Sequence, residues 1–162
     1  ASRGLGDVYK RQILVFLKLN TMIRTILFSM LLMVSSILVA QSPIGKWKTI
    51  DDETGAAKSI VEIFENNGKL YGKVVEILTP GKQNLTCTKC KGNLKDKPVV
   101  GLQIIRGLKK DGKEWGDGVI TDPVSGKEYK AKLSMSGNNT LNVRGYVGIS
   151  LIGRTQTWTR VK

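Results

Sequence analysis

The sequence lacks histidine altogether, although it is 162 residues long. Histidine supplies the general base of serine and cysteine hydrolases and is a common ligand of catalytic zinc. Its absence excludes Ser-His-Asp and Cys-His catalysis, and also metal sites built on imidazole. A Walker-type phosphate loop is missing as well, because the 18 glycines fall at turns and strand ends.

Acidic residues are scarce, and three of them are the remaining candidates for acid–base chemistry. Glu114, Asp117 and Asp122 lie near one predicted hairpin, where they could form an acid pair or a cation site. They alternate with lysines and glycines in turn segments, which is typical of a solvated hairpin. We therefore expect no enzyme activity, no cofactor and no metal.

Basic residues outnumber acidic ones by 26 to 13. Residues 41–162 keep 21 basic and 12 acidic residues, so their net charge is +9. A basic protein outside the cytosol meets anionic lipid head groups and envelope polymers, and we expect no nucleic-acid partner. An anionic membrane surface is thus a candidate partner, although scattered lysines also suit an ordinary solvated surface. The sequence does not indicate an oligomeric state.

The longest apolar run is too short for a membrane span. It starts after Met22 and Arg24, extends from Thr25 to Val39, and is followed by the small residue Ala40. About 15 apolar residues fall short of the roughly 20 that a spanning helix needs. Residues 22–40 are therefore predicted to be a secretory signal peptide, and a retained anchor is the alternative. The protein is expected to be exported, to the periplasm or the exterior of a bacterium.

Residues 1–21 show neither helical periodicity nor strand alternation. Their start, "SRGLGDVYKRQ", resembles the translated read-through of a sequencing adapter. We interpret them as a non-native extension, with a genuine N-terminal extension as the alternative, and assign the folded domain to residues 41–162.

From residue 44 onward, short β-rich runs alternate with turn chemistry. Asn67-Gly68 and Asp111-Gly112 suit tight hairpins, and Pro123 fixes φ in the turn that Asp122 opens. The sequence predicts strands at 45–51, 58–65, 69–78, 99–108, 114–121, 127–135, 140–147 and 154–161, with one long connection at 79–98.

The side chains of these runs alternate with a period of two. In the sixth run, apolar residues alternate with polar ones, so one face of the sheet is buried and the other is wet. A meander of antiparallel strands can bury such a face in a sandwich or a closed barrel, and the barrel removes exposed edges. We expect an all-β, single, up-and-down eight-stranded β-barrel, whose interior has room for side chains or one small ligand.

The first and last strands carry a recognisable pair of motifs. "IGKW" holds Gly45-x-Trp47, and "GRTQTWTRV" ends near Arg160, which resembles the lipocalin pattern. Residues 43–161 resemble the exported bacterial family known as domain of unknown function 2147. The resemblance implies a lipocalin-like or fatty-acid-binding-protein-like barrel and no established activity.

Trp47 and Arg160 are predicted to close the barrel. A guanidinium on a tryptophan face contributes roughly 0.5 to 2 kcal/mol, depending on burial. The contact would tie the first strand to the last, so its role is structural. Arg154 competes for the same role, because it lies on the same face of its strand.

The cysteines, Cys87 and Cys90, form a C-x-x-C pair. No helix follows to lower a thiol pKa, which disfavours redox work, and a zinc site needs about four ligands. An exported protein favours a disulfide that pins the long connection. A redox pair and a metal site stay open as alternatives.

A ligand site is predicted on the last strand, where Arg154, Gln156, Trp158 and Arg160 share one face. If this row points inward, Arg154 and Gln156 would bind a carboxylate and Trp158 would pack on its chain. Arg144 and Tyr146, one strand away, are expected to complete the polar end. The alternative is that the row faces water or only closes the seam. Residues 148–153, "GISLIG", would be an apolar lid or core filler.

Two functions are compatible with these features. The first is an exported protein that binds a small hydrophobic or amphipathic, anionic ligand without catalysis. The second is a structural or interaction protein of the bacterial envelope, with a filled barrel and a basic surface. Small inward residues, such as Ala131 and Gly145, favour a cavity, whereas a filled core needs large apolar residues throughout.

Overall fold

A computed structural model describes residues 16, 18, 20–24, 41–51 and 54–162. The chain divides into two compact units, Ala1–Ala40 and Gln41–Lys162, and only the second is considered below. The expected extension and signal peptide fall mostly outside the described residues. Within those residues, no helix is both long and apolar enough to cross a membrane.

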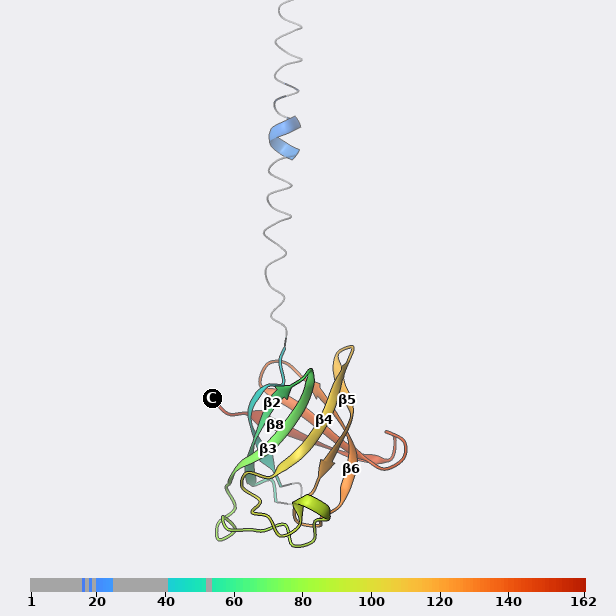
Figure 1. Cartoon of the computed structure of the whole chain (residues 1–162). Coiled ribbons are helices and arrows are strands. Elements are labelled where there is room, and N and C mark those ends of the chain that lie inside the picture. The colour runs from blue at the N-terminus through green and yellow to red at the C-terminus, as the bar shows by residue number, and fades with distance from the viewer. Residues whose placement is uncertain (1–15, 17, 19, 25–40, 52–53) are drawn as a thin grey trace, which may run out of the picture. The chain divides into compact units, whose positions relative to one another are not determined.

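Eight antiparallel strands form a closed barrel within the described residues of the second unit (Figure 1). Each strand pairs with the next along the chain, and the last pairs with the first, which confirms the predicted up-and-down barrel. The strands are β1 (Gly45–Ile50), β2 (Ala57–Asn66), β3 (Lys69–Ile77), β4 (Gln103–Asp111), β5 (Glu114–Thr121), β6 (Glu128–Met135), β7 (Thr140–Tyr146) and β8 (Gly153–Arg160).

The hairpin turns follow the predicted chemistry. Asn67 and Gly68 both have positive φ, at 51° and 71°, as a type I′ turn between β2 and β3 requires. Asp122 closes the β5–β6 turn through its carboxylate, which accepts hydrogen bonds from Val124 N at 3.0 Å and Ser125 Oγ at 2.6 Å. Local side-chain bonds of this kind favour the turn conformation.

The barrel has two different ends, which we name by their connections. The closed end contains the start of β1, the tight turns at 67–68, 112–113 and 136–139, and the end of β8. The loop end contains the connections at 51–56, 78–102, 122–127 and 147–152. This separation follows from the antiparallel order of the strands.

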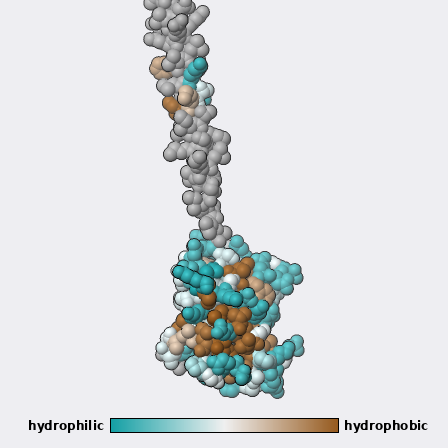
Figure 2. Space-filling model, turned by 90° about the vertical axis from the view of Figure 1, so that its left-hand side faces the viewer, coloured by the Kyte–Doolittle hydropathy of each residue, from teal (hydrophilic) through white to brown (hydrophobic). Residues whose placement is uncertain are grey.

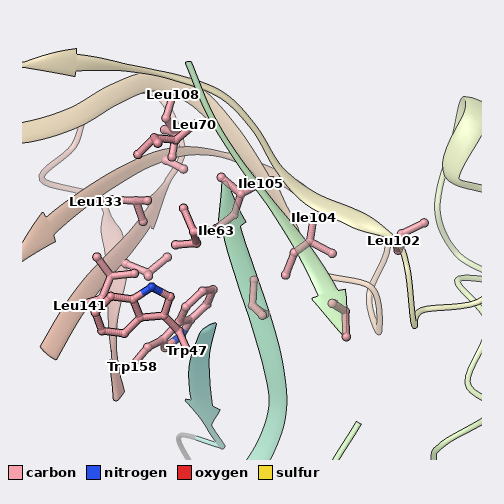
Figure 3. Packing of buried hydrophobic residues seen from close by; sticks show 14 of the residues in the cluster. Trp47, Ile63, Leu70, Leu102, Ile104, Ile105, Leu108, Leu133, Leu141 and Trp158 are labelled. Atoms are coloured by element: carbon pink, nitrogen blue, oxygen red, sulfur yellow. The ribbon is translucent and has the colours of Figure 1, made fainter. Parts of the chain in front are cut away.

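Large apolar side chains fill the barrel interior toward the closed end (Figure 3). In Figure 3 the side chains of Trp47, Trp158, Ile63, Leu133 and Leu141 lie close together, with Leu70 and Leu108 beyond them. All of them are buried. Burial of these large side chains stabilises the fold, and they occupy the interior deep in the barrel.

The outer face of the barrel is mixed in character. On β2 and β3 the rings of Phe64 and Tyr71 stack with their centroids 5.9 Å apart, and the Lys73 ammonium lies 5.6 Å from the Phe64 centroid. Figure 2 shows that apolar residues gather in a patch on one side of the domain, with hydrophilic residues around it. Strict alternation between an apolar inner face and a polar outer face therefore holds only in part.

The connection from residue 78 to residue 102 is longer than the predicted one. β4 begins at Gln103, not at Val99 as predicted, because Val99 and Leu102 are buried in the connection. Two backbone hydrogen bonds join this segment to β3: Gly101 N donates to Val74 O at 2.7 Å, and Val74 N donates to Leu102 O at 3.0 Å. The first part of the apolar run, residues 99–102, is therefore a buried turn, and only the part from Gln103 onward is a strand.

A disulfide between Cys87 and Cys90 stabilises the same connection, which confirms the predicted clasp. Both cysteines are buried, and a single 3-10 turn, η1 (Gly92–Leu94), follows them. Cys87 Sγ lies 3.2 Å from the carbonyl oxygen of Pro123 in the β5–β6 turn. The long connection thus packs against a neighbouring turn and covers part of the loop end.

Candidate functional site

Trp47 and Arg160 meet at the closed end of the barrel. Trp47 is fully buried, and the guanidinium carbon of Arg160 lies 4.2 Å from its ring centroid. The indole Nε1 donates to Pro43 O at 2.7 Å. The contact joins the first strand to the last, because Trp47 and Arg160 are also paired residues of β1 and β8.

The Arg160 guanidinium also binds the backbone around this contact. It donates to Ser42 O at 2.6 Å, Ile44 O at 2.9 Å and Asn138 O at 2.7 Å. The same contact explains why the G-x-W motif has glycine at position 45. A Cβ there would lie 2.8 Å from Arg160 Nη1. These contacts give Arg160 a structural role, and Arg154 lies toward the opposite end of β8.

The row Arg154, Gln156, Trp158 lies on the inner face of β8. Each residue is paired with a residue of β7, in the order Gly145, Val143 and Leu141. Val143, Leu141 and Trp158 are all buried. Paired residues of antiparallel strands point to the same face, so the side that carries this row is the interior.

Along this row the interior changes from apolar to charged. Trp158 is 2% exposed, Gln156 is half-buried, and Arg154 is exposed where β8 begins at the loop end. The indole Nε1 of Trp158 donates to Gln156 Oε1 at 3.1 Å. The neighbouring strands contribute small side chains at the level of Arg154, since Ala131 is paired with Gly145 and Gly145 with Arg154.

Arg144 and Tyr146 do not join this row, contrary to the prediction. Arg144 is paired with Thr155 and Tyr146 with Gly153, so both point to the outer face. The Arg144 guanidinium instead binds the following connection, donating to Ser150 O at 2.7 Å and Leu151 O at 3.2 Å. The polar end of the predicted ligand site therefore contains neither Arg144 nor Tyr146.

Residues 147–152 are neither a closed lid nor core filler in this structure. The side chains of Val147, Ile149, Leu151 and Ile152 are exposed, and Leu151 is exposed to 83%. In Figure 1 this connection lies at the right of the barrel, clear of the connection at 78–102. The segment is an apolar surface feature, and its side chains contribute nothing to the core.

A hydroxyl pair on the inner face was not predicted. Thr49 of β1 and Ser59 of β2 are paired residues, and their Oγ atoms lie 2.8 Å apart. They follow Trp47 and Val61 on the inner face, toward the loop end. The signal was present in the sequence, because Thr49 lies two residues from Trp47 and therefore on the same side of the strand.

The described residues offer no group of three or more acidic or cysteine side chains that could hold a metal ion. Glu114 lies 3.5 Å from the Lys132 ammonium, and Asp122 binds its own turn. The three carboxylates considered from the sequence are therefore not brought together as an acid pair.

The fold and its motifs can now be compared with known proteins. The family described as "Uncharacterized protein conserved in bacteria (DUF2147)" matches residues 45–160. The chain belongs to this family. Its match covers the complete barrel, from the start of β1 to the end of β8.

One solved structure resembles this DUF2147 barrel. It is described as "Protein HP1028 from the human pathogen Helicobacter pylori belongs to the lipocalin family", and the similarity has a TM-score of 0.66. The two sequences are 22% identical, over 75% of this chain and 84% of the other. The similarity shows a lipocalin-like fold. No curated protein matches the chain.

Proposed function

We propose that this DUF2147 protein is an exported carrier or sensor that binds an amphipathic, monoanionic small molecule at the loop end of its barrel. One observation carries the proposal, namely the change along the inner row of β8 from buried Trp158 through half-buried Gln156 to exposed Arg154. A ligand with an apolar chain and one charged end has the same order of polarity. Eight-stranded barrels of the lipocalin type have room for one small ligand.

Arg154 would bind the anionic group of such a ligand. A guanidinium donates two parallel hydrogen bonds to a carboxylate, and charge-assisted bonds of this kind are about twice as strong as neutral ones. The side-chain amide of Gln156 is a second donor one step deeper. The apolar chain would lie against Val143 and the small residues Ala131 and Gly145.

The packed interior limits how deep the ligand can lie. Trp47, Trp158 and Leu141 fill the barrel toward the closed end. The proposed site therefore occupies only the loop end, where the small residues and the Thr49–Ser59 hydroxyl pair are found. A ligand whose apolar part is short or only partly inserted suits this depth better than a long ligand that is fully enclosed.

The second candidate function is an interaction protein of the bacterial envelope, with no ligand in the barrel. The filled core toward the closed end favours it, because a barrel filled by its own side chains needs no ligand for stability. Under this alternative Arg154 binds no ligand and only adds positive charge to the surface. The two functions make different predictions for the mass of the purified protein.

Native mass spectrometry of protein purified without detergent tests the proposal. We expect a reproducible added mass, and uptake of added lauric acid but not of its methyl ester, which has no anionic group. Arg154→Ala should abolish both. The matched control is Lys48→Ala, because Lys48 is an exposed cation on the outer face of β1. A clean unliganded mass with no uptake of lauric acid would leave the interaction protein as the better explanation.

A further inference from the structure

The β7–β8 connection presents an apolar tip that no other part of the described chain covers. We define this tip as residues 147–152, in which Val147, Ile149, Leu151 and Ile152 are exposed. Four adjacent large aliphatic side chains in water are costly unless they serve contact with an apolar partner. The proposed ligand site does not use them, because they lie outside the barrel.

The tip is held in a defined conformation. Within it, Ile152 N donates to Ile149 O at 3.1 Å, and Val147 N donates to Ile152 O at 3.2 Å. Arg144 adds bonds from its guanidinium to Ser150 O and Leu151 O, and a third to Thr155 Oγ1 at 2.8 Å. Since Arg144 lies on the outer face, these bonds hold the tip against the outside of the barrel and not over its mouth.

The two strands that flank the tip, β7 and β8, carry charge of one sign. From residue 129 to residue 162 the chain has six cationic side chains and no acidic one. Arg144 and Arg154 lie on β7 and β8, the strands that flank the tip, and Lys130 and Lys132 lie on the adjacent strand β6. The neighbouring carboxylates are already paired, Glu128 with Arg106 and Glu114 with Lys132.

An apolar tip on a cationic stem is complementary to a surface that is apolar inside and anionic at its rim. From this geometry we infer that residues 147–152 insert into the interface of a membrane containing anionic lipids. The aliphatic side chains enter the acyl boundary, and the flanking cations lie at the level of the lipid phosphates. This inference is independent of the ligand proposed for the barrel.

A tryptophan placed at the tip reports on insertion directly. In the full-length chain, Leu151→Trp should leave the melting temperature unchanged, because Leu151 packs against nothing in the core. With vesicles of equimolar phosphatidylglycerol and phosphatidylcholine, its emission, measured as the difference from the parent chain with its three native tryptophans, should shift to the blue and be quenched by brominated lipids. Vesicles of phosphatidylcholine alone, or about 0.5 M salt, should largely remove both signals, because screening weakens attraction to anionic lipid.

Two controls separate the tip from the rest of the protein. Lys113→Trp, in the tight turn at the closed end, should keep a water-like difference emission with the same vesicles. In the Leu151→Trp chain, replacing Ile149 and Ile152 by serine should raise the lipid concentration needed for quenching at least tenfold, since each isoleucine loses apolar burial. Val124→Ser removes an exposed valine from another connection at the loop end and should change nothing.

Several results would overturn the inference. If the difference emission of the Leu151→Trp chain stays water-like while the chain sediments with anionic vesicles, another segment binds them. A blue shift that needs lauric acid but no vesicles would identify the tip as a lid. A shift that depends only on protein concentration would identify the tip as a contact between two copies. If Val124→Ser weakened quenching as much as the serine replacements of Ile149 and Ile152, membrane insertion could not be assigned to this tip.

Discussion

The two ends of the barrel are built from the same strands but differ in what fills and covers them. At the closed end, short turns join the strands and the interior is packed with two tryptophans and several aliphatic side chains. At the loop end, connections of up to about 25 residues emerge, and the long one buries Cys87, Val99 and Leu102. The inner faces of the strands there also carry small, hydroxyl and charged side chains. The comparison predicts a separation along the barrel axis, in which the closed end contributes more to the stability of the domain than the loop end.

Such a separation has a physical basis. A tightly packed region tolerates few changes, because each lost methylene group creates a cavity or strain. Long connections can change more freely, since they contribute less to the core. If the closed end supplies most of the stability, substitutions there should unfold the whole domain, and substitutions at the loop end should act locally.

The largest effect is expected for Trp47→Ala at the closed end. Removing a fully buried tryptophan that also contacts Arg160 should lower the free energy of unfolding by about 3 to 5 kcal/mol. Urea denaturation followed by circular dichroism measures the change. Trp115→Ala, at a half-buried tryptophan, serves as the control and should cost less. An unchanged midpoint for Trp47→Ala would contradict its role in closing the barrel.

A smaller effect is expected for Gly126→Ala at the loop end. A Cβ at residue 126 would lie 2.0 Å from the carbonyl oxygen of Lys89, so the long connection must move away. We expect a loss of about 2 to 3 kcal/mol, which combines the clash with the cost of positive φ.

Gly137→Ala is the matched control for this change. Gly137 also has a positive φ of 73°, but nothing lies within 4 Å of the position its Cβ would take. It should show only the backbone cost, about 1 kcal/mol. Hydrogen exchange should rise in residues 85–99 for Gly126→Ala alone, and equal effects of the two variants would show that the connection does not pack on the turn.

Reduction of the disulfide should have a still smaller and more local effect. Cys87 and Cys90 close a very short loop, so the entropy model gives no more than about 2 kcal/mol. Intact mass before and after reduction with alkylation verifies the bond, and hydrogen exchange measures its effect. We expect faster exchange in residues 79–98 and little change in the strands. Global unfolding on reduction would show that the loop end carries more of the stability than the comparison indicates.

The smallest effect is expected for Arg160→Lys. Lysine keeps the charge but loses the planar stacking on Trp47 and most of the bonds to three backbone carbonyls. We expect a loss of about 1 kcal/mol in thermal denaturation. Arg154→Lys, on the same strand, is the comparison and should cost less, because Arg154 is exposed.

The sequence predicts the closed end better than the loop end, for identifiable reasons. Asn67-Gly68 encodes its turn locally, and Trp47 and Arg160 mark the first and last strands. The start of β4 was misplaced because Val99–Leu102 has the composition of a strand and yet is buried as a turn. Composition alone does not distinguish these two uses of an apolar segment.

The inner row of β8 shows how far period-two reasoning extends. It groups Arg154, Gln156 and Trp158 correctly, but the face shared with β7 depends on the register between the strands. A shift of one residue would have placed Arg144 beside Gln156, and the length of the 147–152 connection decides this. The orientation of Arg144 and Tyr146 therefore required the three-dimensional structure.

The seam between β1 and β8 has a further consequence for how the barrel opens. Among the described residues these strands pair at two positions, whereas β7 and β8 pair at seven. The seam also joins segments more than a hundred residues apart, so its closure carries a larger loop entropy than any hairpin. Separation of β1 from β8 leaves every hairpin intact, so the contact between Trp47 and Arg160 is what holds the barrel closed against this opening.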